Sequence, residues 1–261
     1  MLTTRPRRIR AAWEAGTTAY GVAVQLPSPD LVEIAGQAGL DYAWIDAEHG
    51  SLSLSEIREL IRGADAVGID TVVRVPDHDP SFIQRVLDLG AAGIMAAHVC
   101  TVEQAATLVA AARYAPAGLR GACPATRSVG HVTTDWTGDR RRADDDVLVF
   151  GLIEDPEGLE NVEAIASQSG IDGLVFGPFD LSMAQGLDGD VGHDKVRKMH
   201  DRVVRACRDA GVDYVVANAA WEFEGLAATG SRTVTVAGDR GVLFEGLHRS
   251  LESARSPGAF R

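Results

Sequence analysis

The stretch TVVRVPDHDPSFIQRVLDLGAAGIMAA, residues 71–97, decides the fold that the sequence predicts. It begins with a short apolar run typical of a β-strand, residues 71–75, and ends with another, residues 93–97. The segment between them has helical spacing of apolar residues and reaches Gly90, where a left-handed residue suits a helix end. Strands that are apolar on both faces and joined by a helix indicate a parallel sheet.

The same alternation of strand and helix extends over the whole chain. Eight apolar runs have the length of strands: residues 20–24, 42–46, 71–75, 93–97, 147–153, 173–177, 213–217 and 233–237. Their number and the chain length of 261 residues match an α/β fold of the (β/α)8 type. We therefore expect a single TIM-barrel domain over residues 1–261, with an additional N-terminal helix. A doubly wound open sheet is the alternative, but VQLPSPD at 24–30 offers no glycine-rich phosphate loop.

Start and stop signals place helices between these runs. Ser53 precedes Glu56, and Thr101 precedes Gln104, at the spacing of a capping box. Pro156 suits a first helical turn. Glycines stand between a helical pattern and the next strand at positions Gly39, Gly68, Gly90, Gly170 and Gly211. Left-handed helix ends are expected there.

The connection between the fourth and fifth runs is unusually long. It contains one helical pattern and then residues 115–146, which are rich in Gly, Thr, Arg and Asp. Connections of that length are often functional, so we expect a lid-like loop after the fourth strand.

Composition excludes several classes of function. The chain is 46% hydrophobic and 24% charged, as in ordinary globular proteins, and its net charge of -12 disfavours nucleic acid as a partner. Three cysteines, Cys100, Cys123 and Cys207, lack the spacing of a zinc site or a disulfide framework, which fits a reducing cytoplasm. No apolar run approaches the roughly 18 residues that span a bilayer, and no signal peptide is evident. We expect a cytoplasmic protein with no membrane partner.

Charged residues stand where the predicted strands end, and in a parallel barrel those ends converge on one mouth. The candidates are Asp46, Glu48, His49, Arg74, Glu154, Asp155 and Asp180. A strand-end aspartate such as Asp46 is more often a helix cap or loop acceptor than a catalyst. Arg74 lies within an apolar run, where an unpaired charge is costly, so it must find an anion from the protein or a ligand.

Two of these carboxylates predict a metal site. Glu154 and Asp180 both follow apolar runs and should project into the mouth, where like charges repel unless a cation joins them. Carboxylates and water form an oxygen site suited to Mg2+ or Mn2+, whereas zinc prefers nitrogen and sulfur. A divalent metal held by Glu154 and Asp180 is the simplest arrangement.

Six motifs in one order resemble the HpcH/HpaI aldolase family, the metal-dependent class II pyruvate aldolases, of the 4-hydroxy-2-oxoheptanedioate aldolase type. They are IDAEHG at 45–50, VVRVP at 72–76, RVLDLGAAGIM at 85–95, ARYAPAGLRG at 112–121, IEDPEGLENV at 153–162 and DGLVFGPFDLS at 172–182. The resemblance covers residues 21–251. It is specific for the family and much less so for any one substrate.

The resemblance implies a ligand set for the metal and the substrate. Glu154 and Asp180 would be the metal ligands, with Mg2+ or Mn2+ expected and Co2+ as a further option. The backbone around Phe179 and Asp180 would bind the substrate carboxylate. Arg74 would hold the carboxylate and carbonyl side of pyruvate and stabilise its enolate.

The resemblance also implies the reaction, a reversible cleavage of a 4-hydroxy-2-oxo acid to pyruvate and an aldehyde. His49 would be the acid/base, working through a metal-bound water, with Asp88 orienting it. The residues agree, because a divalent ion and a guanidinium stabilise the enolate charge and a histidine moves a proton near neutral pH. The only lysines, Lys195 and Lys198, lie in a polar helical segment, so a Schiff base has no good candidate.

Several positions depart from the family pattern. They are Ala97, Cys100, Cys123, Arg127 and His131. By the resemblance they face the variable half of the substrate, so the sequence leaves the aldehyde open. Asn218 and Trp221 are candidates to line the pocket, and a cap and a packing aromatic are equally good readings of them.

Two other functions stay open. A related enzyme could use the same enolate with another electrophile, in citrate-like condensation, on an acyl-CoA thioester, or after decarboxylation. The acidic net charge and the lack of a cluster for CoA phosphates argue against the thioester version. A non-catalytic barrel subunit is disfavoured, because the charged set of the family is complete.

The resemblance further implies a homo-oligomer, a trimer or hexamer of barrels, with exchanged C-terminal helices. Apolar residues at Val242, Leu243, Leu247 and Leu251 permit a docking helix. They do not indicate whose barrel that helix covers.

Overall fold

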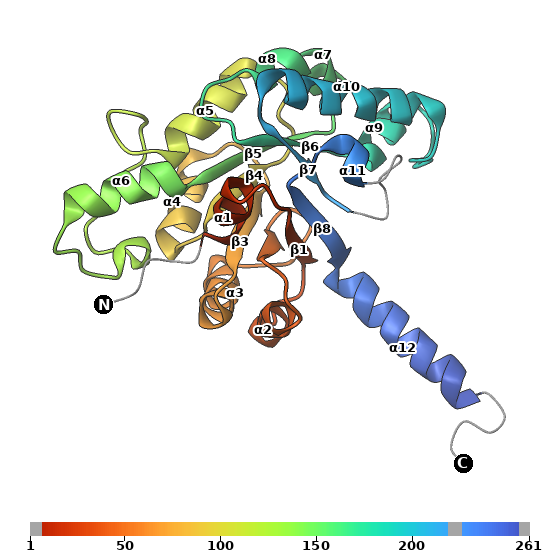
Figure 1. Ribbon diagram of the computed structural model, residues 1–261, viewed down its shortest axis with the longest axis horizontal. Helices are drawn as coiled ribbons and strands as arrows, with labels where there is room; N and C mark the ends of the chain where they lie inside the picture. The colour runs from red at the N-terminus through yellow and green to blue at the C-terminus, as the bar shows by residue number, and fades with distance from the viewer. Residues whose placement is uncertain (1–6, 219–225, 256–261) are drawn as a thin grey trace.

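Eight parallel strands close into a barrel in the computed structural model, which describes residues 7–218 and 226–255 (Figure 1). The strands are β1 (Ala19–Val24), β2 (Tyr42–Asp46), β3 (Asp70–Val75), β4 (Gly93–Ala96), β5 (Leu148–Ile153), β6 (Gly173–Phe176), β7 (Asp213–Val216) and β8 (Thr233–Gly238). Each strand pairs with the next along the chain, and β1 pairs with β8, which completes the cylinder. The predicted (β/α)8 fold is confirmed.

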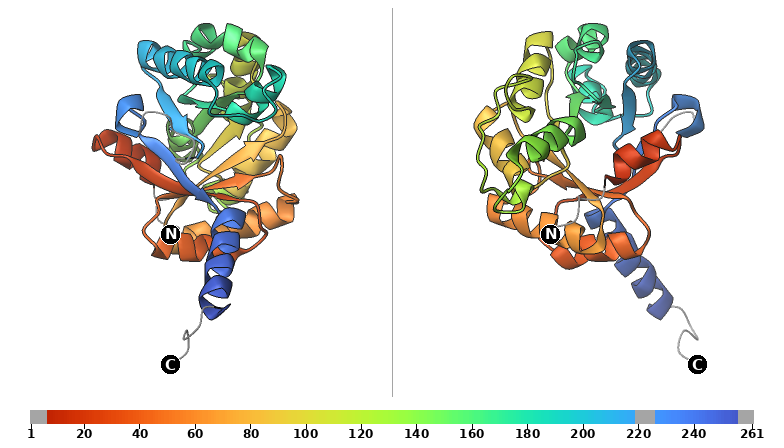
Figure 2. Two further views of the ribbon diagram at one scale, coloured as in Figure 1. Left: turned by 90° about the vertical axis from the view of Figure 1, so that its right-hand side faces the viewer. Right: turned by 60° about the vertical axis from the view of Figure 1, so that its left-hand side comes forward.

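Helices surround this barrel (Figure 2). They are α1 (Arg8–Glu14), α2 (Pro29–Gln37), α3 (Leu54–Val67), α4 (Pro80–Leu89), α5 (Val102–Ala112), η1 (Arg127–Val129), α6 (Trp136–Asp146), α7 (Pro156–Glu160), α8 (Val162–Ala166), α9 (Pro178–Ala184), α10 (Asp194–Ala210), α11 (Leu226–Thr229) and α12 (Asp239–Arg255). The predicted capping boxes form at Ser53 and at Thr101, and α1 is the expected N-terminal helix. None of the helices within 7–218 and 226–255 is long and apolar enough to cross a membrane.

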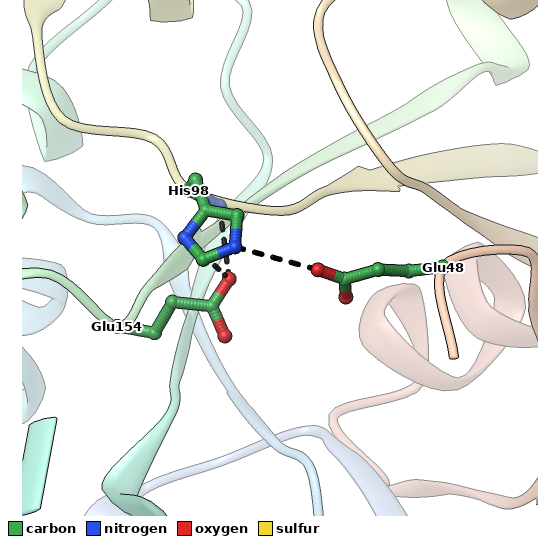
Figure 3. Close-up of side chains that lie close together, drawn as sticks. All are labelled: Glu48, His98 and Glu154. Carbon is green, nitrogen blue, oxygen red and sulfur yellow. Dashed lines mark hydrogen bonds and ion pairs between the residues drawn. The ribbon is translucent and has the colours of Figure 1, made fainter. Parts of the chain in front are cut away.

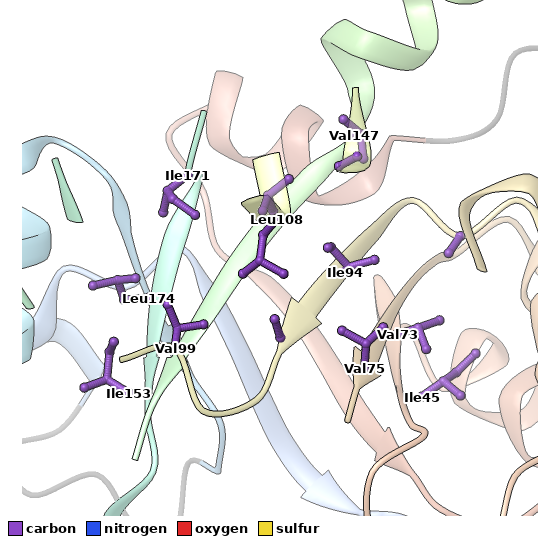
Figure 4. Packing of buried hydrophobic residues seen from close by; sticks show 14 of the residues in the cluster. Ile45, Val73, Val75, Ile94, Val99, Leu108, Val147, Ile153, Ile171 and Leu174 are labelled. Carbon is purple, nitrogen blue, oxygen red and sulfur yellow. The ribbon is translucent and has the colours of Figure 1, made fainter. Parts of the chain in front are cut away.

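Two apolar cores follow from the alternation of side chains along the strands. The outer core lies between strands and helices, and Figure 4 shows part of it, with Ile45, Val73 and Ile94 from the strands and Leu108 from α5. The inner core fills the barrel with Ala19, Tyr42, Trp44, Val72, Met95, Leu148, Phe150, Leu152, Val175 and Val215. Ile9 of α1 belongs to the inner core and is fully buried, so α1 closes one end of the barrel.

A buried carboxylate fastens α1 to the barrel. The peptide nitrogen of Ile9 donates a 2.9 Å hydrogen bond to Oδ2 of Asp70, the first residue of β3. Burial raises the pKa of Asp70 to about 7 in spite of that hydrogen bond and of the nearby Arg7 and Arg8. The amino-terminal end of the barrel is therefore covered by protein.

The long connection expected to be lid-like does not cover the mouth of its own barrel. Residues 115–146 contain η1 and the helix α6. The sequence of α6, WTGDRRRADDD, has no apolar period, and the helix buries none of its residues. Since α5 runs back against the strands, the chain that follows it lies at their amino-terminal ends. The Tyr114 peptide nitrogen donates to Asp144 there at 2.8 Å, and Arg127 donates to Leu89 O at 3.0 Å and pairs with Asp65.

A large cavity lies at this amino-terminal end. It has a volume of about 910 Å3 and is lined by Asp70 and Leu148, which begin β3 and β5, and by Arg127 and His131. Cys123 is exposed on the same segment. Because the candidate catalytic residues follow the opposite ends of the strands, this cavity is separate from their mouth.

Helix α12 projects away from the barrel (Figures 1 and 2). Its first residue, Asp239, is buried and accepts 2.8 Å hydrogen bonds from the peptide nitrogens of Gln25 and Leu26 after β1. Farther along, Val242, Leu243, Phe244, Leu247 and Leu251 are all exposed. The first residue of α12 is thus fixed by hydrogen bonds. The apolar side chains farther along the helix stay exposed to solvent in one chain.

Replacing Asp70 with Asn should change how stability depends on pH. The Asp70 carboxyl has an ordinary pKa of 3.8 and a folded pKa of about 7, so the folded state gains protons relative to the unfolded state between these values. Wild type should therefore lose stability relative to the variant as pH rises through this window, by up to about 4 kcal/mol. Urea unfolding at pH 4.5 and pH 8, with the exposed Asp209→Asn as control, measures the difference. A pH-independent difference would contradict the assignment.

Candidate active site

The inward positions of the strands change from apolar to charged at the carboxyl end of the barrel. Along β2, Tyr42 and Trp44 fill the interior, and Asp46 occupies the next inward position. Along β3, Val72 is followed in the same way by Arg74. Because side chains alternate between the two faces of a strand, the charged residues form a layer above the apolar interior.

Arg74 and Asp46 form a buried bidentate ion pair in this layer. They are register partners on β3 and β2, and Arg74 Nε and Nη2 lie 2.8 and 2.6 Å from the two Asp46 oxygens. The Arg74 side chain is 11% exposed and that of Asp46 is 3% exposed. Arg74 Nη1 lies 3.0 Å from Glu48 Oε2, and the guanidinium stacks over Trp44. The protein itself thus supplies the anion that Arg74 was predicted to need.

The same contacts set the charge of the pair. Burial would raise the pKa of Asp46, but hydrogen bonds from Arg74 and Gln25 hold it below its ordinary value. Burial likewise opposes the charge of Arg74, and its carboxylate neighbours Asp46 and Glu48 raise its pKa instead. Both groups are charged at neutral pH.

Glu154 follows β5 directly and is another buried carboxylate of the mouth. Its side chain is 3% exposed, and Oε1 accepts a 2.9 Å hydrogen bond from the peptide nitrogen of His98. Burial raises the pKa of Glu154 to about 7; the charges of Glu48 and Asp180 add to the rise, and His98 opposes it. Two other carboxyl groups therefore lie close enough to disfavour the charge of Glu154.

His98 stands two residues after β4, and its imidazole reaches the same space (Figure 3). Its Nδ1 lies 2.8 Å from Asp155 Oδ2 and 3.5 Å from Glu154 Oε1, and its Nε2 lies 3.4 Å from Glu48 Oε1. Burial would lower the pKa of His98, but the hydrogen bond with Asp155 and the nearby carboxylates raise it. Its φ of 54° is left-handed, a conformation that costs a non-glycine residue about 1–3 kcal/mol.

Glu48, His98 and Glu154 form a group that can hold a divalent metal. One ligand atom of each lies within 4.8 Å of the other two. Glu48 Oε2 is buried and accepts no well-aligned hydrogen bond from the described residues, although Arg74 Nη1 is close. A buried oxygen without a hydrogen bond, among carboxylates that repel one another, fits a bound cation. The group shares Glu154 with the predicted pair of metal ligands, whereas Asp180 is not part of it.

The predicted dyad of His49 and Asp88 is not formed within one chain. The His49 side chain is 62% exposed at the mouth, with Nε2 3.7 Å from Glu48 Oε2. Asp88 lies in the last turn of α4 and accepts a 2.7 Å hydrogen bond from Arg120. Because α4 runs back toward the amino-terminal ends of the strands, its last turn lies far from a residue that follows a strand. A joint role for the two residues stays a prediction.

The remaining candidates lie beside the mouth or outside the described residues. Phe179 and Asp180 are exposed in the first turn of α9, and Asp180 is close enough to raise the pKa of Glu154. Asn218 lines a small pocket with Pro178 and Tyr214. Trp221 lies outside the described residues.

Sequence reasoning assigned no role to His98, and none to Gln25. His98 lies in AAHVC just after a predicted strand, the same signal that singled out Asp46 and Glu154. Gln25 directly follows β1, and its Nε2 donates to Asp46 Oδ2 at 2.7 Å. Considering the polar residues that follow every predicted strand would have singled out both His98 and Gln25.

A family model described as HpcH/HpaI aldolase/citrate lyase matches residues 20–245. The chain belongs to this family. One curated relative, the 4-hydroxy-2-oxovalerate aldolase of Novosphingobium aromaticivorans, is 36% identical over 219 residues, which cover 81% of each chain. The resemblance that the motifs indicated is confirmed, and with it the assignment to metal-dependent aldolases that act as carbon–carbon lyases.

Solved structures of the family have the same barrel. An HpcH/HpaI aldolase from Desulfitobacterium hafniense DCB-2 superposes with a TM-score of 0.87 at 29% identity, covering 97% of this chain and 98% of that one. A citrate synthase superposes with a TM-score of 0.85 at 28% identity, covering 96% and 98%. The same barrel thus occurs in an aldolase and in a citrate synthase.

Replacing Asp46 with Asn should destabilise the protein. The change removes the charge that balances Arg74 and leaves a guanidinium with a reduced counter-charge in a buried layer. Loss of one partner of a buried pair typically costs about 3 kcal/mol or more. Urea unfolding at pH 7 would measure the loss, with Asp209→Asn as the matched surface control. A variant as stable as that control would show that the pair does not stabilise the barrel.

Proposed function

We propose that this chain is a divalent-metal-dependent aldolase that reversibly cleaves a 4-hydroxy-2-oxo acid to pyruvate and an aldehyde. The observation that carries this proposal is the group of Glu154, Glu48 and His98 beside the Arg74 guanidinium at one mouth. Cation ligands and a fixed positive charge lie where an enolate oxygen would need both. The 4-hydroxy-2-oxovalerate aldolase among its relatives supports the same substrate class.

The metal would be held by Glu154 and Asp180, and Mg2+ or Mn2+ are the expected ions, with Co2+ as a further option. A bound divalent ion supplies a Lewis acid for the 2-oxo group. Glu154 is buried at the end of β5, and Asp180 comes from the first turn of α9. The charge of Asp180 raises the pKa of Glu154, and this proximity supports placing both carboxylates around one cation.

Arg74 would position the 2-oxo acid. Two of the five N–H groups of its guanidinium donate to Asp46, and Nη1 lies 3.0 Å from Glu48 Oε2, so these carboxylates hold the plane of the group fixed. The rest can donate to the carboxylate and carbonyl oxygens of pyruvate, together with the backbone around Phe179 and Asp180. A fixed guanidinium stabilises the enolate oxygen without reorganising as its charge develops.

His49 would move the proton. In cleavage, the base takes the proton of the 4-hydroxyl, the bond between C3 and C4 breaks, and its electron pair forms the enolate as the aldehyde leaves. Protonation at C3 then gives pyruvate. The exposed imidazole of His49 beside the mouth suits this exchange. A supporting role of Asp88 needs a contact beyond those within one chain.

A second candidate keeps the enolate and changes the electrophile. The likeness to a citrate synthase favours it specifically. The discriminating measurement is a screen of wild type and metal with pyruvate plus short aldehydes, against pyruvate plus keto-acid acceptors such as oxaloacetate. Carbon–carbon bond formation only in the second set would replace the aldolase proposal.

Glu154→Gln should abolish enolate formation from pyruvate. Proton–deuterium exchange at the pyruvate methyl, followed by NMR with Mg2+ or Mn2+, needs no assumption about the aldehyde. We expect metal-dependent exchange in wild type and a loss of roughly 100-fold or more in Glu154→Gln and Asp180→Asn. The exposed Glu157→Gln is the control and should exchange like wild type. Exchange at the wild-type rate in both site variants would remove the metal ligands from the mechanism.

We infer that the protein is a homo-oligomer that buries α12. Five apolar side chains of this helix are exposed in one chain, and the helix projects beyond its own barrel (Figure 2). Reciprocal exchange of α12 between two copies would cover them, and exchanged pairs fit a hexamer better than a trimer.

Free cysteines, one of them exposed, support the cytoplasm as the compartment.

Phe244→Asp with Leu247→Asp should dissociate this assembly, because two charges would enter an apolar contact. Light scattering after size exclusion should give a multiple of 27.7 kDa for wild type and a smaller mass for the variant. The exposed Glu245→Gln on the same helix is the control. A wild type that elutes as a monomer would contradict the proposal.

A further inference from the structure

We propose that His98 is itself a metal ligand, through Nε2, so that the metal site combines nitrogen and oxygen donors. This inference rests on the divalent metal of the proposed function and adds a ligand to it. The Glu154 and Asp180 pair alone would form an oxygen site. The structure places an imidazole in the same space, between Glu48 and Glu154 (Figure 3).

The two ring nitrogens of His98 have different neighbours. Nδ1 lies 2.8 Å from Asp155 Oδ2, a hydrogen bond in which the ring donates to the carboxylate. In the neutral ring the proton is then on Nδ1, and Nε2 has the lone pair that a metal needs. A histidine that binds a metal usually donates its other ring nitrogen to a carboxylate in this way. Asp155 is therefore a positioning residue for His98.

Nε2 is the ring nitrogen that faces Glu48. It lies 3.4 Å from Glu48 Oε1, and the ligand atoms of Glu48, His98 and Glu154 all lie within 4.8 Å of one another. Two ligands about 2.0–2.2 Å from one ion are separated by about as much as Nε2 and Glu48 Oε1 are. The Glu48 side chain is only 10% exposed; its Oε1 faces His98, while its Oε2 lies 3.0 Å from Arg74 Nη1.

The backbone holds His98 in place independently of the side chain. Its peptide nitrogen donates a 2.9 Å hydrogen bond to Glu154 Oε1, so the nitrogen and oxygen donors are tied to each other. Strands β4 and β5, which precede these two residues, are hydrogen-bonded neighbours. The left-handed backbone of His98 turns the chain at this point. The donors are thus fixed by the barrel before any ion binds.

An imidazole ligand changes which metal the site prefers. Oxygen donors suit Mg2+, whereas imidazole nitrogen suits transition metals, whose affinities rise from Mn2+ through Co2+ to Ni2+. The site with His98 should therefore bind Co2+ much more tightly than Mg2+. Without His98 it should approach the weaker discrimination of an all-oxygen site.

Pulsed electron paramagnetic resonance of the tag-free chain loaded with Mn2+ tests the ligand directly, because coupling to 14N appears only when a nitrogen is bound. We expect this coupling in wild type, its loss in His98→Ala and in His98→Gln, and its retention in His49→Ala and His78→Ala. Wild type without 14N coupling, or coupling that persists without His98 and disappears without His49, would overturn the assignment.

Calorimetric titration with Co2+ and with Mg2+ gives a second readout. His98→Ala should weaken Co2+ binding by about 10–100-fold and Mg2+ binding far less, and Asp155→Asn should weaken Co2+ binding by about tenfold through the loss of orientation. Equal losses for both metals would overturn the proposal, since they indicate a general disturbance of the mouth. Nitrogen coupling with no pyruvate exchange would refute the aldolase alone, whereas exchange without nitrogen coupling would refute only the role of His98.

Discussion

The alternation of side chains between the inside and outside of a closed barrel governs everything built on it. Inside, large apolar side chains fill the space, and a glycine makes room for one of them: a Cβ on Gly21 would lie 2.5 Å from the Tyr42 ring. Because β2 and β3 are in register, the first charged inward residues above the apolar interior lie at the same height on both strands. Asp46 and Arg74 meet there and neutralise each other in a layer that water reaches poorly.

Above that pair the mouth holds more negative than positive charge. Arg74 satisfies Asp46 and approaches Glu48, but the nearby Glu154 is left with the imidazole and peptide of His98. Burial without a full counter-charge is what raises the pKa of Glu154. In the proposed function the same imbalance would attract a cation, and the fixed guanidinium beside it would receive the anionic substrate. Both roles would then follow from one uneven charge distribution.

The two ends of the barrel are built from different parts of the chain. Residues that follow strands form the mouth, whereas connections that follow helices cover the other end, where α1 closes the interior and residues 115–146 form a cavity wall. The long connection was expected to act as a lid because its composition is that of a mobile loop. Composition carries no information about which end a segment reaches; the direction of α5 decides that. Asp88 follows the same rule, since it lies in the last turn of α4 and pairs with Arg120.

The eight strands, the capped helices and the family were predictable from the sequence, because periodicity, caps and motifs are local properties of the chain. The sequence also placed Arg74 within an apolar run, and Glu154 and Asp180 after apolar runs. The folded barrel was needed to show that Asp46 takes up the charge of Arg74, that His98 reaches Glu48 and Glu154, and that Asp88 lies apart from His49. These contacts join residues far apart in the chain, and their distances exist only once the barrel has closed and fixed the register, height and direction of each element.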